Sequence, residues 1–161
     1  MKQLILVRHA KSSWDAPLKD IDRTLEHRGI KDAHLVAIHS LSFIPKKFQM
    51  FSSIAKRATE TALIFAQNFS FPIESIIFKE ELYTFDENKL EKIIKSFPNH
   101  YDHIILFGHN EAITNFVNKF GDVYIDNVPT SGFVSLQFDA DSWADIHDGK
   151  TVKTIFPKDL K

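Results

Sequence analysis

Two adjacent residues near the start of the chain, Arg8 and His9, have the chemistry of a phosphoryl-transfer site. They directly follow four apolar residues, 4–7, which predict a short strand buried on both faces. A buried strand seldom ends in two adjacent basic or titratable groups unless an anion binds there. Arginine offers a fixed fork of donors that matches phosphate oxygens. A neutral histidine is a nucleophile, and an ordinary pKa of about 6.5 leaves much of it neutral at pH 7.

Two further residues, Arg57 and His109, follow other apolar runs in the same way. Ser52 and Ser53 end a second predicted strand, and Arg57 follows one helical turn later. His109 comes after Gly108 at the end of another predicted strand, just before a helix N-terminus that favours anions. Taken singly, Arg57 is typical of a solvated helix surface and His109 of a cap or loop. Together with the first pair, at three strand ends, they predict one anion site.

The elements that must position these residues follow from the hydrophobic pattern. Short apolar runs predict strands at residues 4–7, 48–51, 76–78, 103–107 and 133–138, with 151–156 as a hairpin partner of the last. Apolar stripes at 3.6-residue spacing predict helices between them, within residues 30–41, 58–69, 90–97 and 112–120. The first stripe includes Ile30 and Leu41, and a capping box of Thr84 and Glu87 is expected before the third helix.

Strands that alternate with helices of this length predict an α/β layer fold, in one domain over residues 1–161. Successive strands joined by helices run parallel, so their C-terminal ends share the sheet edge at which ligands bind. Arg8, His9, Arg57 and His109 should therefore meet there. His9 would form a covalent phosphohistidine while the other three bind the phosphoryl oxygens. This chemistry requires no metal ion.

The composition narrows the possible partners. A formal net charge of -1 gives no general reason to bind nucleic acid or an anionic membrane, so any anion site must be local. The lack of cysteine excludes disulfides, thiolate metal sites and cysteine-dependent phosphatases. The first apolar run is too short for a signal peptide, and no run reaches transmembrane length. We therefore expect a cytoplasmic location.

These motifs resemble those of the histidine phosphatase superfamily, which has an Arg-His-Gly signature and includes phosphoglycerate mutases. Residues 6–10 match that signature with Ala10 in place of glycine, and residues 108–110 resemble the third motif. Residues 53–62 resemble the second, Ser-Pro-x-x-Arg-Ala-x-x-Thr-Ala, with Ile54 in place of proline. Other features are similar to one branch, the small SixA-like phosphohistidine phosphatases: Asp22-Arg23, Arg28-Gly29, Glu81-Leu82-Tyr83 and Pro129-Thr130-Ser131.

The resemblance implies a phosphoglycerate mutase-like, three-layer αβα domain with a mostly parallel sheet and no large insertions. It implies that His9 is the nucleophile, that Arg8, Arg57 and His109 bind phosphate, and that neither cofactor nor metal is needed. Glu81 has the position of the general acid in many relatives, although it is equally typical of an exposed acidic pair with Glu80.

Four other polar residues have less certain roles in that resemblance. Ser12, Asn110 and Thr130 are further candidates for substrate binding, the last two also being typical turn or cap residues. Asp15 falls where mutases often have an asparagine beside the phosphate. A carboxylate there would repel the anion, so either Asp15 points away or this part of the pocket differs.

Three functions are compatible with the sequence. The first is a phosphatase acting on phosphohistidine in a protein, such as a histidine phosphotransfer protein. Imidazole is a better leaving group than an alkoxide, so this reaction needs less help from an acid. The second is a phosphatase for small phosphoesters, which should need Glu81. The third is a non-catalytic phosphate-binding or docking module, against which the intact His9 argues.

Overall fold

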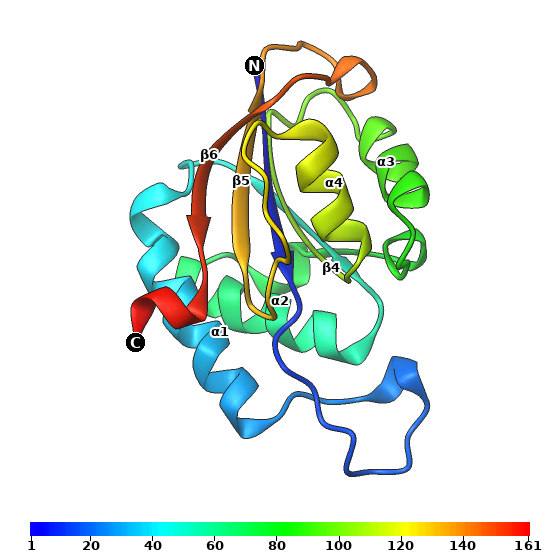
Figure 1. Cartoon of the computed structure of the whole chain (residues 1–161), viewed down its shortest axis with the longest axis vertical. Helices are drawn as coiled ribbons and strands as arrows, with labels where there is room; N and C mark the ends of the chain where they lie inside the picture. The colour runs from blue at the N-terminus through cyan, green and yellow to red at the C-terminus, as the bar shows by residue number, and fades with distance from the viewer.

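The computed structural model describes all 161 residues, and six strands form one sheet in the order β3-β2-β4-β1-β5-β6 (Figure 1). Neighbouring strands from β3 to β1 run parallel, whereas β5 and β6 are added antiparallel. The predicted mostly parallel sheet and the hairpin formed by the last two strands are confirmed. The strands are β1 (Lys2–Arg8), β2 (Gln49–Ser53), β3 (Ile77–Lys79), β4 (His103–Gly108), β5 (Phe133–Phe138) and β6 (Lys150–Ile155).

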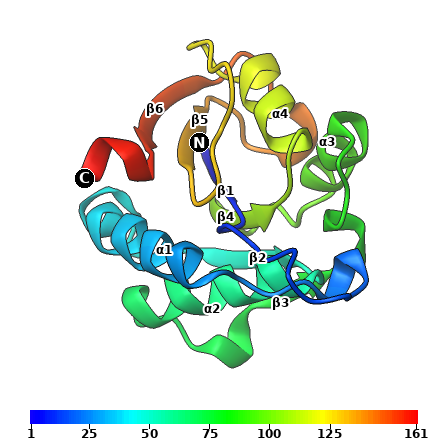
Figure 2. The same cartoon turned by 60° about the horizontal axis from the view of Figure 1, so that its bottom comes forward.

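Four helices cover the two faces of the sheet and complete the expected three layers. In Figure 2, α1 and α2 lie on one side of the strands and α3 and α4 on the other. Along β1 successive side chains point to opposite faces of the sheet, and both faces are buried. Ile5 and Val7 pack towards the first pair of helices, and Leu4 and Leu6 towards the second. None of these helices combines the length and apolarity needed to cross a bilayer. The helices are α1 (His27–Ser40), α2 (Lys56–Phe69), α3 (Glu87–Lys95) and α4 (Ala112–Phe120).

Two details expected of the helices are wrong. The stripe on α1 does not include Ile30 and Leu41, which are 39% and 46% exposed. The helix begins earlier than its apolar pattern suggests and buries small residues against its neighbours, Gly29 and Ser40 among them. The cap of α3 is Asp86 rather than Thr84, because the Asp86 carboxylate already accepts the amide of Asn88.

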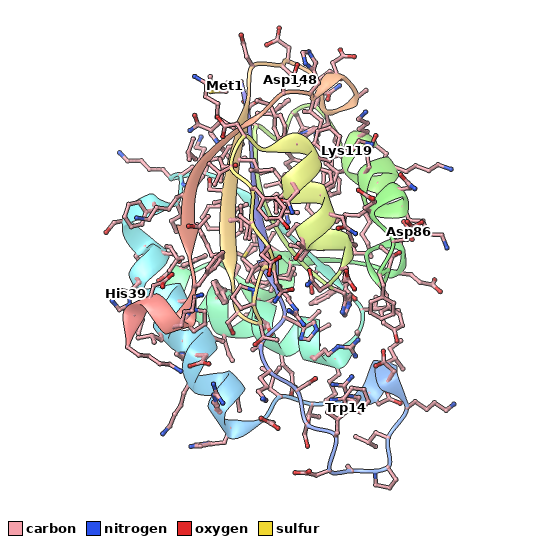
Figure 3. All side chains as sticks on the ribbon, in the orientation of Figure 1. Met1, Trp14, His39, Asp86, Lys119 and Asp148 are labelled. Atoms are coloured by element: carbon pink, nitrogen blue, oxygen red, sulfur yellow. The ribbon has the colours of Figure 1, made fainter.

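The segment between β1 and α1, residues 9–26, forms a long loop that extends from the C-terminal edge of the sheet (Figure 1). This β1–α1 loop contains a short 3₁₀ turn, Asp20–Asp22, and its two arms pair where Ser12 bridges Leu25. Figure 3 shows Trp14 on this loop, at the opposite end of the molecule from Asp148 of the β5–β6 connection. The loop therefore overhangs the sheet edge at which Arg8 ends β1.

Gly29 is a position in α1 where a side chain does not fit. A Cβ there would overlap the carbonyl oxygen of Lys11, two residues after His9. Although Gly→Ala normally stabilises a helix, we expect Gly29→Ala to lower the free energy of unfolding by about 1–3 kcal/mol through this overlap. Urea unfolding measures the change. Lys31→Ala, at an exposed position of the same helix, is the control and should change stability by less than about 0.5 kcal/mol. Equal or greater stability of Gly29→Ala would contradict the packing.

Candidate active site

One cavity, of about 570 Å³, brings Arg8, His9 and Arg57 together at the C-terminal end of β1. His109 adjoins it, with its ring centroid 5.2 Å from that of His9. The four residues that the sequence places at separate strand ends are thus neighbours in space. Another cavity, of about 500 Å³, lies between residues 45–49 and 100–103 and contains no arginine. The other residues lining the first cavity are Lys11, Ser12, Trp14, Asp20, Arg23, Glu26, Phe85 and Thr130.

His9 is held as a neutral ring with one nitrogen free. Its Nδ1 lies 2.8 Å from the carbonyl oxygen of Ala10. A carbonyl can only accept, so the proton of the ring is on Nδ1 and the lone pair is on Nε2. Burial lowers the pKa of His9 from 6.5 to about 4, helped by the charges of Arg57 and Arg8 and opposed by the bond to Ala10. At neutral pH, Nε2 has the electronic state of a nucleophile.

Arg8 and Arg57 are anchored by their outer nitrogens and leave their inner nitrogens unpaired. Arg8 Nη1 donates to the carbonyl oxygen of Val128 at 2.9 Å. Arg57 Nη1 and Nη2 donate to the carbonyl oxygen and to Oδ2 of Asp20, at 2.7 and 3.0 Å. In both arginines Nε is buried without an acceptor. Both arginines line the cavity, and each outer nitrogen has a second N–H with which it can bind an anion there.

His109 adds a buried, neutral ring to the site. Its Nε2 lies 2.8 Å from Ser53 Oγ at the end of β2. Ser53 Oγ also accepts the amide of Ala55, and because a hydroxyl oxygen has two lone pairs, this contact fits a proton on either nitrogen of His109. The other nitrogen, Nδ1, is buried without a partner. Burial, together with His9 and Arg57, lowers the pKa of His109 to about 2, so the ring is neutral at pH 7.

Thr61 ties the nucleophile's strand to the helix that carries Arg57. Its hydroxyl oxygen accepts the amide of Ala10 at 2.9 Å and donates to the carbonyl oxygen of Arg57 at 2.7 Å. This side chain is fully buried and lies in the segment that resembles the second family motif. This hydroxyl therefore links the residue that follows His9 to α2 at the cavity.

The other candidate residues divide between the cavity and its surroundings. Ser12 and Thr130 line the cavity, and the hydroxyl of Ser12 accepts a bond from Arg23. Asn110 does not line it. Its amide group bonds Thr114 and Asn127 instead, which stabilises the start of α4.

The two carboxylates whose roles were in question both lie outside this cavity. Glu81 is exposed and lines a separate cavity with Lys89 and Lys92, because the 3₁₀ turn that contains it buries its neighbour Leu82. Asp15 is exposed on the β1–α1 loop and is not part of the lining. Asp15 therefore does not face the anion site, which is the first of the two possibilities expected from the sequence.

Sequence reasoning missed Asp20, a residue that contacts both Arg57 and Arg23 in the cavity. Partial burial alone would raise the pKa of Asp20, but hydrogen bonds from Tyr83 and Arg57 lower it to about 2. No local pattern indicates this contact, because Asp20 and Arg57 are 37 residues apart in the chain. No three His, Cys, Asp or Glu side chains lie close enough together to hold a metal ion.

Comparison with known proteins identifies one family profile, the histidine phosphatase superfamily (branch 1), which matches residues 4–124. The comparison with curated proteins finds no match. Among solved structures, the protein histidine phosphatase SixA complexed with tungstate has a TM-score of 0.83 at 19% identity, over 99% of both chains. SixA of Agrobacterium tumefaciens has a TM-score of 0.77 at 21% identity, over 96% of this chain and 97% of that one.

A more distant structural likeness is to a mycobacterial glucosyl-3-phosphoglycerate phosphatase. Its TM-score is 0.69 at 10% identity, over 94% of this chain and 97% of that one. At these identities the likenesses establish the fold alone. The phosphoglycerate mutase-like fold expected from the sequence is confirmed by the SixA structures.

The two buried histidines should make stability depend on pH. Their pKa values are lowered in the folded chain, so between pH 6.5 and about 4 the unfolded chain binds more protons and folding weakens as pH falls. We expect the free energy of unfolding to fall between about pH 7 and pH 5, by on the order of 1 kcal/mol from each histidine. His109→Asn should make this dependence shallower in urea unfolding. His27→Asn, at an exposed position, should not. Identical slopes for all three proteins would refute the neutral state of His109.

Proposed function

Because the chain is a phosphatase of the histidine phosphatase superfamily (branch 1), we propose that it removes phosphoryl groups from phosphohistidine through a phosphorylated His9. The observation that supports this most is the meeting of Arg8 and Arg57 with a neutral His9 at one cavity, with the ring of His109 5.2 Å from that of His9. Two fixed cations and a neighbouring imidazole suit the oxygens of a phosphoryl group in transfer.

The first step of the proposed reaction transfers the phosphoryl group to the enzyme. His9 Nε2 attacks phosphorus, the bond from phosphorus to the substrate nitrogen breaks, and the substrate's ring, already protonated on its other nitrogen, leaves as neutral imidazole. Arg8 and Arg57 neutralise the charge on the phosphoryl oxygens, and His9 keeps its Nδ1 proton on Ala10 throughout. In the second step water attacks phosphorus and the Nε2–phosphorus bond breaks. Water supplies the oxygen and the protons of the released phosphate.

The acidic residues favour a leaving group that departs without strong acid assistance. Glu81, the candidate acid, lines another cavity. Asp20 and Glu26 are the carboxyl groups that line the right one. Asp20 has a pKa of about 2 and so carries no proton at neutral pH, which leaves Glu26 as the only carboxyl group of the cavity for an acid role. An alkoxide would need a proton from the enzyme as it leaves, whereas a phosphohistidine ring can arrive already protonated on its other nitrogen. We therefore favour a phosphohistidine protein in the cytoplasm, such as a histidine phosphotransfer protein, as substrate.

A small phosphoester is the second candidate substrate, and the size of the cavity supports it. About 570 Å³ is within the usual range for small-molecule sites. The fold is also similar to that of a mycobacterial glucosyl-3-phosphoglycerate phosphatase. For such a substrate the same His9 chemistry would apply, with the leaving oxygen taking a proton from a group other than Glu81.

A substrate panel tests the proposal. We expect kcat/KM for a phosphohistidine-bearing protein to exceed that for an alkyl phosphate by at least about a hundredfold, because only the ester lacks a good leaving group. His9→Ala should abolish both activities while the circular dichroism spectrum is unchanged. A higher kcat/KM for the alkyl ester would reject phosphohistidine as the substrate, and substantial turnover by His9→Ala would reject the nucleophile.

The same panel tests whether Glu81 donates a proton to the leaving group. We expect Glu81→Gln to change kcat/KM for either substrate by less than about twofold, because the side chain lies outside the cavity. Glu80→Gln is the matched control, since this neighbour lines the same separate cavity. If Glu81→Gln strongly lowers kcat/KM for the alkyl ester and Glu80→Gln does not, Glu81 does reach the substrate.

A further inference from the structure

The β1–α1 loop places Asp20 where it contacts both outer nitrogens of Arg57. Arg57 Nη1 donates to the Asp20 carbonyl oxygen at 2.7 Å, and Nη2 donates to Oδ2 at 3.0 Å. Two bonds from a planar guanidinium to one residue set both its position and its rotation. The side chain of Arg57 is only 3% exposed, whereas that of Asp20 is 41% exposed.

Asp20 is itself fixed by two other side chains. Its Oδ1 accepts from Arg23 Nη1 at 3.0 Å, and its Oδ2 also accepts from the hydroxyl of Tyr83. Arg23 in turn bonds the carbonyl oxygen of Ser13 and stacks on the ring of Trp14, 3.3 Å from its centroid. One carboxylate therefore joins α2, the turn after β3 and the β1–α1 loop.

The two arginines of the cavity differ in what anchors them. Arg8 donates to a main-chain carbonyl, that of Val128, and this anchor survives any side-chain substitution. Arg57 is anchored in part by the carboxylate of Asp20. Both guanidinium groups line the cavity with His9. Removal of the Asp20 carboxylate takes one of two anchors from Arg57 and leaves its bond to the Asp20 carbonyl oxygen, whereas no side-chain substitution removes the anchor of Arg8.

We propose that Asp20 is a positioning residue for the phosphoryl site, which holds the guanidinium of Arg57 at the cavity in the pose that binds the anion. The part of this proposal that concerns catalysis rests on the proposed function. Electrostatics alone makes the opposite prediction, because a carboxylate in an anion-binding cavity repels the anion and its removal should tighten binding. The sign of the effect therefore separates a positioning role from a purely electrostatic one.

Binding of vanadate to the purified chain, measured by calorimetry, tests the sign without requiring turnover. We expect Asp20→Ala to weaken vanadate binding at least about tenfold, in line with the loss of a charge-assisted anchor. Asp20→Asn should weaken it less, because its amide oxygen can still accept from Arg57. Asp22→Asn is the control. This exposed aspartate is in the same 3₁₀ turn but forms no ion pair, so it should bind vanadate within about twofold of wild type.

Kinetics provide a second readout, which a loss of stability would not reproduce. Asp20→Ala should lower kcat as well as raise KM, because Arg57 acts on the transferred group in the transition state. Asp20 is ionised at all working pH values, given its pKa of about 2, so the loss should be equal between about pH 6 and pH 8. Tyr83→Phe removes one bond to the same oxygen and should give a smaller loss of the same kind.

Several outcomes would overturn the positioning role. Vanadate binding in Asp20→Ala that equals or exceeds that of wild type would do so, as would a loss that depends on pH in this range. Equal losses in Asp20→Ala and Asp22→Asn would also reject it. If vanadate binding behaves as expected but phosphohistidine is not hydrolysed by the wild type, the proposed function fails and the positioning of Arg57 stands.

Discussion

The parallel pairing of β1 with β4 and of β4 with β2 is the constraint on which the site depends. In this register Arg8 is opposite Gly108, and Ser52 is opposite Phe107, so three strands end at nearly the same level. The chain then leaves the sheet at His9, at His109 and just before α2, all on one edge. Side chains far apart in sequence meet because the main-chain hydrogen bonds of the sheet leave no other register for buried apolar strands.

Burial then determines the chemistry of the residues that meet at this edge. It lowers the pKa values of His9 and His109, so both rings are neutral and the positive charge belongs to the arginines. Arginine keeps its proton in such surroundings, which is why it can be buried beside two neutral histidines. The result is a neutral nucleophile beside fixed cationic donors. The same apolar packing that stabilises the ends of the strands thus leaves the two histidines neutral and the two arginines charged.

Much of the fold could be predicted because its central strands are buried on both faces and appear in the sequence as continuous apolar runs, as residues 4–7 do. The positions of Arg8 and His109 followed from where such runs stop. Two kinds of feature could not be predicted. Gly29 is buried in α1 because of its small size, which hydrophobic spacing does not register. The contact of Asp20 with Arg57 depends on the path of an irregular loop, for which the sequence contains no periodic signal.

Direct observation of a phosphoryl analogue in the cavity is the most decisive test of this account. We expect a crystal structure with vanadate to show vanadium in line with His9 Nε2. Its oxygens should lie about 2.7–3.1 Å from guanidinium nitrogens of Arg8 and Arg57 and from a ring nitrogen of His109. Vanadate bound away from His9, or bound there without contacts to these three side chains, would contradict the account.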